Sequence, residues 1–207
     1  MALAGPAGDA CASLDVSEIY SFDLEELAHK WFGTTSADHP GVARLIQAGG
    51  VFVAGEITPA EKMAWPHGPH ALSPSQIRSI FASKGWSRVV GFHAEHASPR
   101  LHEYVRVLDL QGVHADGMYV GLVVRPRESD DRAPSGRLLL GSSVTRPRHC
   151  GPREAVFNAL CYRNLGCSHF VVERSYRRID GFYEDARTRE LFESLGDIGI
   201  VPIFVDF

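Results

Sequence analysis

Histidines, carboxylates and an arginine crowd the segment 93–103, which reads HAEHASPRLHE. Ser98 and Pro99 are typical of a helix start, because a hydroxyl caps free N–H groups and proline suits the first helical position. The free N–H groups and the dipole of a helix start favour a phosphate group. The segment therefore predicts phosphate binding by His93, His96, Ser98, Arg100 and His102. A metal held by two histidines and Glu95, and histidines that only face solvent, are the alternatives.

A second basic cluster occupies the segment 145–155, TRPRHCGPREA. Glycine followed by proline predicts a turn whose proline lies in the first turn of a helix. Positive side chains oppose the dipole at such an end, so a bound anion explains Arg146, Arg148 and Arg153 better than helix stability does. A charged face exposed to solvent is the alternative.

Both segments follow predicted strands. Apolar runs predict strands at 86–92, 118–124, 138–144, 169–172 and 200–205. Helices are expected at 75–84, 98–110, 152–164 and 187–195. This alternation is typical of an α/β fold, an open parallel sheet with helices on both faces, in which ligands bind beyond the carboxyl ends of the strands.

The proline-rich stretch 59–74 predicts a boundary before this sheet. Helices at 23–30 and 39–47 and a strand at 51–54 predict a small α+β unit ahead of it. His39 is expected to cap its helix or to pack, and residues 1–14 are expected to be disordered. Aromatic residues expected in the core are Tyr119, Phe157 and Phe170.

The composition is that of a globular chain: 207 residues, 44% hydrophobic, with a formal charge of -4. No apolar run approaches the ~20 residues of a membrane helix, and no basic region marks a signal peptide. We therefore expect a cytoplasmic protein without a membrane partner, and the negative charge argues against a nucleic-acid partner. The four cysteines form no CxxC pair, which predicts free thiols and no structural metal.

The segment 150–170, CGPREAVFNALCYRNLGCSHF, closely resembles the AGPREA–HAIIRKNFGCTHF segment of ATP sulfurylases (sulfate adenylyltransferases). The resemblance continues at DHPGVARL (38–45), GWSRVVGF (85–92), HEY (102–104) and ESDD (128–131), and runs from about residue 15 to the end. The chain is identified as a divergent, shortened member of that family. The resemblance implies a Rossmann-like nucleotidyltransferase sheet over 73–207, preceded by a partial PUA-like domain over 15–72.

The sequence differs from the family pattern in three motifs that serve the family's chemistry: the Q-x-R-N-P loop, the HxxH pair and the GRDHAG segment. The family's Q-x-R-N-P loop is replaced by residues 93–97, so that Glu95 stands at the place of its arginine. Pro99 replaces the first histidine of the family's HxxH pair, and His102 matches the second. Of the family's GRDHAG segment only Arg174 is retained. A carboxylate repels a sulfate dianion, which makes sulfate a poor acceptor here.

In the family, sulfate attacks the α-phosphorus of ATP and pyrophosphate leaves, with catalysis by charge neutralisation. The resemblance implies a transferase that moves a nucleotidyl group, expected to be adenylyl, from a nucleoside triphosphate with Mg²⁺ to an acceptor other than sulfate. Catalytic roles are expected for His96, His102 and Glu95. Nucleotide contacts are expected from His93, Ser98, Arg100, His102, Arg146, Arg148, Arg153 and Arg174.

Two other functions stay open from the sequence. The chain is then either a catalytically inactive nucleotide-binding or scaffold subunit, or an enzyme with residual sulfate adenylyltransferase activity. The resemblance also implies a homo-oligomer or a partner subunit.

Overall fold

The computed structural model describes residues 1–5, 8, 10–60, 72–94, 112–122, 137–142, 147–173 and 181–205. The chain divides into two compact units, Met1–His67 and Gly68–Phe207. This division falls within the proline-rich stretch 59–74, a few residues before the predicted limit at residues 72 and 73. Residues 61–71, which include the division between the two units, lie outside the described residues.

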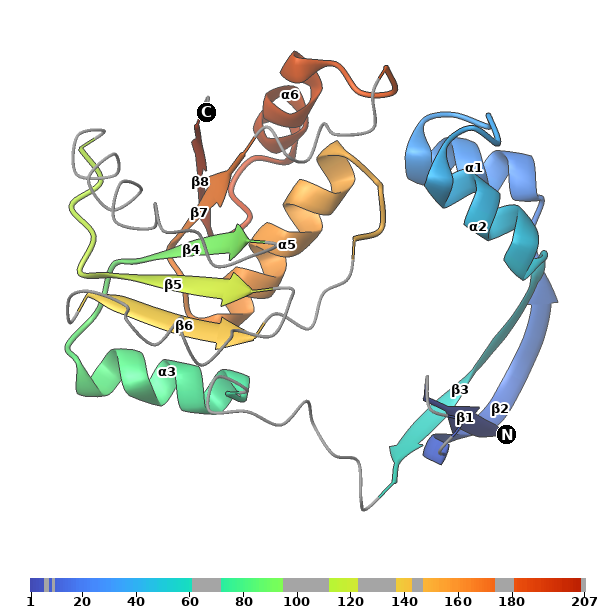
Figure 1. Ribbon diagram of the computed structural model, residues 1–207, viewed down its shortest axis with the longest axis horizontal. Coiled ribbons are helices and arrows are strands. Elements are labelled where there is room, and N and C mark those ends of the chain that lie inside the picture. Colours follow the sequence, from blue (N-terminus) through green and yellow to red (C-terminus); the bar gives the residue numbers. More distant parts are fainter. Residues whose placement is uncertain are drawn as a thin grey trace. The chain divides into compact units, whose positions relative to one another are not determined.

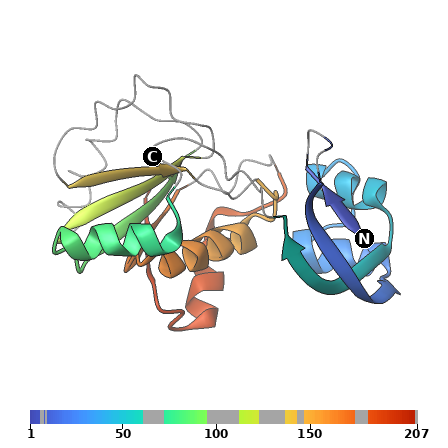
Figure 2. The ribbon, with the colours of Figure 1, turned by 90° about the horizontal axis from the view of Figure 1, so that it is seen from below.

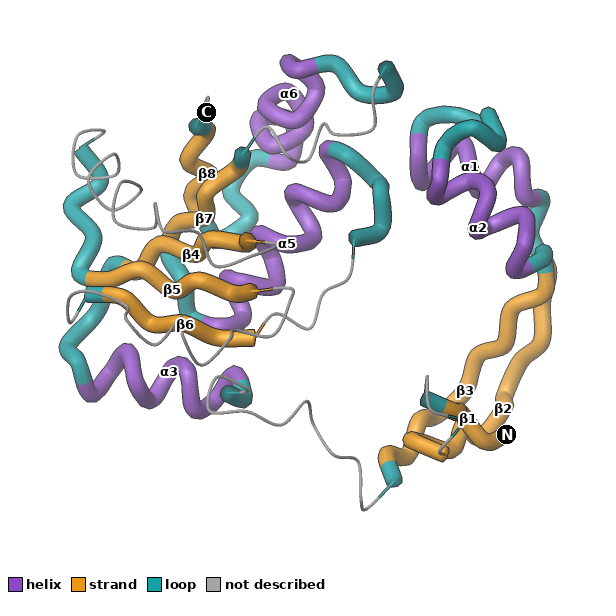
Figure 3. Tube along the Cα trace, viewed as in Figure 1, coloured by secondary structure: helices purple, strands orange, loops and turns teal. Residues whose placement is uncertain are grey.

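The first unit contains a three-stranded antiparallel sheet in the order β1-β2-β3. Its strands are β1 (Ala2–Ala4), β2 (Ala10–Ser21) and β3 (Val51–Pro59), and Figure 3 shows β2 and β3 as two long strands that run side by side. The expectation of a disordered start is thus wrong for residues 2–4 and 10–14. Small residues there carry little strand propensity, but residues 2–4 pair with β2 and residues 12–14 pair with β3. A 2.7 Å hydrogen bond from the Met1 amino group to the Leu14 carbonyl oxygen adds to this order.

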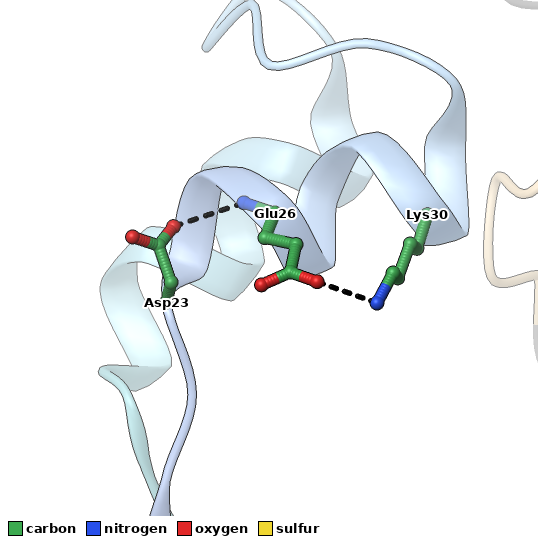
Figure 4. Close-up of polar contacts among 3 residues, drawn as sticks. All are labelled: Asp23, Glu26 and Lys30. Carbon is green, nitrogen blue, oxygen red and sulfur yellow. Dashed lines mark hydrogen bonds and ion pairs between the residues drawn. The ribbon is translucent and has the colours of Figure 1, made fainter.

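Two helices, α1 (Leu24–Phe32) and α2 (Pro40–Ala48), lie between β2 and β3 in the chain. The carboxylate of Asp23 accepts the backbone N–H of Glu26 at 2.9 Å, which caps α1 (Figure 4). One turn later the Glu26 carboxylate pairs with the Lys30 ammonium at 2.5 Å on the exposed face. An acidic start and a basic end both suit the helix dipole, so α1 is locally well specified.

His39 caps α2, as its position before Pro40 predicted. Its Nδ1 accepts the backbone N–H groups of Gly41 at 3.1 Å and Val42 at 3.4 Å. The imidazole is fully buried, and its ring centre lies 4.9 Å from that of Phe32. The capping interpretation is therefore confirmed.

The second unit is built on a parallel sheet in the order β6-β5-β4-β7-β8 (Figure 1). Counted along the chain within this unit, the order is third, second, first, fourth and fifth, which is the Rossmann order. The expected Rossmann-like open parallel sheet is confirmed. Its strands are β4 (Val89–Ala94), β5 (Gly117–Leu122), β6 (Leu138–Ser142), β7 (His169–Val172) and β8 (Val201–Phe204).

Three helices pack against one face of this sheet, as Figure 2 shows. They are α3 (Pro74–Ser83), α5 (Pro152–Leu165) and α6 (Asp185–Leu195). A second apolar cluster, which includes Phe92 and Val120, forms the opposite face. The helix predicted over residues 98–110 lies outside the described residues, so a helix on that second face stays a prediction.

Candidate functional site

The carboxyl ends of the parallel strands meet at one edge of the sheet, where β4 and β7 flank the point at which the strand order reverses. Much of the predicted site lies in the segments that follow these strands. Of the predicted site residues, the structure describes His93, Arg148 and Arg153. The others lie outside the described residues: Glu95, His96, Ser98, Arg100, His102, Arg146 and Arg174.

His93 stands at the carboxyl end of β4, beside this reversal point. Its side chain is partly buried, and its Nδ1 lies 3.4 Å from the hydroxyl oxygen of Tyr162 on α5. The two rings meet edge to face, with centres 6.1 Å apart. Burial lowers the pKa of His93 to about 4, so the imidazole is neutral at physiological pH.

Tyr162 fixes this end of the sheet from the helix side. Its hydroxyl donates to the carbonyl oxygen of Phe92 at 3.0 Å and lies 3.4 Å from that of Gly121 on β5. Its ring occupies the space above Gly91, where an added Cβ would lie 2.4 Å from a ring carbon. The absent side chain at Gly91 is what allows α5 to approach β4 this closely.

The turn before α5 has a backbone that only particular residues adopt. Gly151 has φ 53° and ψ −122°, and His149 also has a positive φ, 62°. The Glu154 carboxylate closes the turn from the helix side, because its two oxygens accept the N–H groups of Arg148 at 2.8 Å and Cys150 at 3.2 Å. The GPRE motif thus encodes a turn that carries its own charge-assisted hydrogen bonds.

Tyr183 covers the same turn from the other side. Its hydroxyl donates to the carbonyl oxygen of His149 at 2.9 Å, and its ring lies over Gly151, where a Cβ would be 2.6 Å from a ring carbon. Burial raises the pKa of Tyr183 to about 12 and that of the Cys150 thiol to about 11. Cys150 therefore stays protonated near neutral pH and is a weak nucleophile.

The α5 N-terminus presents an exposed cation. Arg153 lies exposed in the first turn of α5, and its backbone N–H and that of Glu154 donate to the carbonyl oxygens of Cys150 and Gly151. Since backbone oxygens already accept these N–H groups, an anion at this end would be held mainly by the Arg153 guanidinium and the helix dipole. α5 begins at the carboxyl edge, because it connects two parallel strands, β6 and β7.

The other described arginine turns back over the helix. The Arg148 guanidinium lies 4.9 Å from the ring centre of Phe157, a cation–π contact. Phe157 is 39% exposed, so the expectation that it belongs to the core is wrong. The face of α5 that meets the sheet is formed instead by Ala155, Ala159 and Tyr162, whereas Tyr119 and Phe170 are buried as expected.

Neither a metal cluster nor a membrane helix is found in the described part of the chain. No group of three or more His, Cys, Asp or Glu side chains could hold a metal ion among these residues. No helix among them is long and apolar enough to cross a membrane.

Comparisons with known proteins match both units. A family model for PUA-like domains matches residues 1–62, and one for ATP-sulfurylase matches residues 129–207. A sulfate adenylyltransferase of Symbiobacterium thermophilum is 34% identical over 224 residues, which cover 100% of this chain and 56% of that protein. The chain is a relative of the ATP sulfurylases. Sulfate adenylyltransferases of a Synechococcus species and of Thermococcus onnurineus are each 31% identical, over 98% and 94% of this chain.

This ATP-sulfurylase relative spans about half the length of the curated relatives it matches. Among solved structures, a hexameric APS kinase from Thiobacillus denitrificans is similar in fold, with a TM-score of 0.60. The similarity covers 99% of this chain and 37% of that one at 17% identity, so it shows the fold alone. The match to PUA-like domains thus precedes the match to ATP-sulfurylase along the chain, which is the order that the sequence predicted.

Sequence reasoning missed three residues that shape the site of this ATP-sulfurylase relative. They are Tyr162, Tyr183 and Glu154, each of which forms hydrogen bonds with backbone atoms. For Tyr162 a signal was present, because a glycine inside a buried strand often marks a close approach by another element. The acid of GPRE, three residues after the helix cap Gly151, was a comparable signal for Glu154.

Proposed function

We propose that this ATP-sulfurylase relative is a nucleotidyltransferase whose acceptor is not sulfate. An oxygen or nitrogen of the acceptor loses a proton to a general base and forms a bond to the α-phosphorus of ATP. The bond from that phosphorus to the bridging oxygen breaks, and pyrophosphate leaves with the electron pair. Similarity over the length of this chain, and over about half of the length of proteins named sulfate adenylyltransferase, supports the transferase assignment. A parallel sheet in the Rossmann order supports it as well.

The observation that carries the choice of acceptor is the partly buried imidazole of His93 at the carboxyl end of β4, whose Nδ1 lies 3.4 Å from the Tyr162 hydroxyl oxygen. Its pKa of about 4 means that it supplies no positive charge to a sulfate dianion at neutral pH. The sequence places Glu95 two residues later, where the family loop has an arginine. Two like charges ~4 Å apart repel by about 4 kcal/mol at an effective dielectric of ~20, so this end of β4 disfavours sulfate.

A hydroxyl-bearing or cationic acceptor fits this environment. Glu95 is proposed as the general base that removes the proton of the acceptor, with His96 and His102 beside the transferred phosphoryl group. The nucleotide is proposed to contact Arg153 at the α5 N-terminus, together with the other predicted contacts: His93, Ser98, Arg100, His102, Arg146, Arg148 and Arg174. Mg²⁺ would come with the triphosphate and lower its negative charge.

The experiment is a pyrophosphate-release assay with ATP, Mg²⁺ and a panel of acceptors. The panel contains sulfate, carboxylates, phosphonates, alcohols, amines and nucleosides. We expect release with at least one hydroxyl-bearing or cationic acceptor, at a rate well above that with sulfate. Background release throughout the panel, or the fastest release with sulfate, contradicts the proposal.

A second candidate function, a non-catalytic subunit, is favoured by the exposed apolar face of the first unit. On β2 and β3, Ile19, Val51 and Ile57 are 69%, 71% and 59% exposed. Ile19 also lies directly opposite Val53, so their side chains share one face of the sheet. Such a face is typical of a surface that another chain covers.

Light scattering tests the second candidate, with Ile19→Lys as the variant and Glu18→Lys as its control. An assembly that Ile19→Lys dissociates and Glu18→Lys preserves, without pyrophosphate release in the assay above, favours the subunit. A monomer that releases pyrophosphate rejects it.

A further inference from the structure

We propose that the first unit pairs with a second copy of this chain, sheet against sheet, through one face of β2 and β3. That partner is the one that the second candidate function leaves open, and the pairing does not require nucleotidyl transfer. The face, called the pairing face below, consists of four cross-strand pairs: Leu14 with Ile57, Val16 with Gly55, Ile19 with Val53, and Ser21 with Val51.

The register of the two strands decides which residues share the pairing face. Side chains alternate between the two faces of a strand, so the odd-numbered residues from 51 to 57 lie on one face of β3. Their partners on β2 lie on the same face, because directly opposed residues of an antiparallel pair project to the same side. All eight residues are uncharged.

A β-bulge at Ser17 keeps the pairing face free of charge. The register shifts just before Glu18, and the Ser17 hydroxyl donates to the carbonyl oxygen of Ala54 at 3.3 Å. Without the shift Glu18 would lie opposite Val53, on the pairing face. The extra residue brings Ile19 opposite Val53 instead and moves Glu18 to the other face.

The side chains of the pairing face are apolar and yet exposed. The exposed fractions are 69% for Ile19, 71% for Val51 and 59% for Ile57, and they are 40% for Val53 and 38% for Val16. Single exposed apolar residues are ordinary, whereas a group on one face of two strands marks a contact surface. In a sandwich of two sheets the inner faces are apolar and the outer faces polar. The described residues of the first unit have this pattern with one sheet.

The charge of the first unit favours a second copy on this face. The unit Met1–His67 contains nine acidic and three basic residues, a formal charge of -6. On the other face of the same strands, Asp15 lies directly opposite Glu56, and Glu18 lies on that face as well. Two copies would repel each other there. Across the pairing face they meet without bringing carboxylates together, while a basic partner would find no carboxylate on it.

A twofold axis would let two copies present the same face to each other. Ile19 and Val53 lie near the middle of the pairing face, so in such a dimer they lie near their counterparts on the second copy. The face is two strands wide and ~24 Å long, which is small beside the about 800 Å² per partner of a standard interface. We therefore expect a reversible dimer whose population rises with protein concentration.

The first test is sedimentation equilibrium of the full chain over a wide range of concentrations. We expect the wild-type protein to dimerise and Ile19→Lys to raise the dimer Kd at least about tenfold, because the lysine would be buried without a partner. Glu18→Lys, which changes the neighbouring residue on the other face, is the matched control and should leave the Kd within about threefold. Val51→Lys is a second variant on the pairing face, and circular dichroism reports whether each variant is folded.

A mixing experiment distinguishes pairing of copies from every other role of the face. Ile19→Lys and Ile19→Glu should each be monomeric where the wild-type protein dimerises. An equimolar mixture of the two should form a heterodimer, because residue 19 of one copy lies near residue 19 of the other. Added salt should dissociate the heterodimer and leave the wild-type dimer intact, since only the heterodimer depends on a charge pair.

Three results overturn the proposal. The first is a wild-type protein that stays monomeric up to ~1 mM. The second is a dimer that neither Ile19→Lys nor Val51→Lys weakens, because it uses another surface. The third is a mixture of the folded Ile19→Lys and Ile19→Glu proteins that stays monomeric. None of these results involves turnover, so each leaves the proposed reaction untouched, and a failed pyrophosphate assay leaves the dimer standing.

Discussion

The hydroxyl of Tyr162, near the end of α5, donates a 3.0 Å hydrogen bond to the carbonyl oxygen of Phe92, near the end of β4. A helix that leads into β7 is thereby tied to the neighbouring strand at the point where the strand order reverses. The relationship fixes the backbone immediately before His93. A single side chain of the core thus reaches the residue at which the chemistry is proposed.

Gly91→Ala should destabilise the protein by about 1 to 3 kcal/mol, because the added methyl group would collide with the Tyr162 ring at 2.4 Å. In a Tyr162→Ala background the same change should destabilise the protein less, because the ring with which the methyl group would collide is absent. Gly117→Ala, which meets the Trp86 ring at 2.4 Å, is the matched control and should cost the same in both backgrounds. Urea unfolding measures all the variants. Equal costs of Gly91→Ala in the two backgrounds would show that the contact is not what limits this position.

Gly151→Ala should lower the free energy of unfolding more than Gly196→Ala does. The two glycines share a backbone region that side chains rarely adopt, with φ 53° and ψ −122° for Gly151 and φ 65° and ψ −143° for Gly196. They differ in their surroundings, because a Cβ at Gly151 meets the Tyr183 ring and one at Gly196 meets open space. Urea unfolding should therefore give a difference of about 1 to 3 kcal/mol. Similar losses of unfolding free energy in the two variants would mean that the Tyr183 ring moves readily to make room for the added methyl group.

Acidification should destabilise the protein through His93. The unfolded chain binds a proton to this side chain near pH 6.5, while burial lowers the native pKa to about 4. As the pH falls through that window the unfolded state binds more protons, so the free energy of unfolding decreases by about 2 to 3 kcal/mol between about pH 7 and pH 4.5. His93→Gln lacks this contribution and serves as the reference in the same measurements. Parallel curves for the two proteins would place the native pKa of His93 near its ordinary value.

Arg153→Ala should weaken ATP binding about tenfold, since a charge-assisted hydrogen bond is worth about 1.5 to 3 kcal/mol. Isothermal titration calorimetry at fixed salt measures the Kd. Lys84→Ala removes one positive charge at the end of α3, the helix that precedes β4, and should leave the Kd within twofold. Equal effects of the two changes would mean that only the total charge matters.

Much of the second unit follows from the sequence because β4 and β5 are buried on both faces. Strands of that kind are continuous apolar runs, such as the one that ends at Phe92, and they contrast with α3, α5 and α6, each of which packs one face against the sheet. The start of β2 is different, because it is rich in alanine and serine and is ordered by pairing with β3, which begins 30 residues after β2 ends at Ser21. No local pattern of residues 10–14 carries that information.

The site was predictable where its parts are local. The turn of GPRE follows from glycine, proline and the acid that closes it, all within a few residues. The contacts of Tyr162 and Tyr183 join segments far apart in the chain, and tyrosines in a helix or a loop give no sign of which backbone oxygen they will reach. Phe157 was assigned to the core as an apolar helix residue, but it lies on the outer face beneath the Arg148 guanidinium.

The proposed reaction is tested most directly by following the α-phosphorus of ATP. The protein is incubated with ATP labelled at that phosphorus, Mg²⁺ and the acceptor panel, and the labelled products are separated. The account predicts a labelled conjugate of the nucleotide with a hydroxyl-bearing or cationic acceptor, formed in the same amount as pyrophosphate. Label found only in adenylyl sulfate, or no labelled product beyond the background without protein, would contradict it.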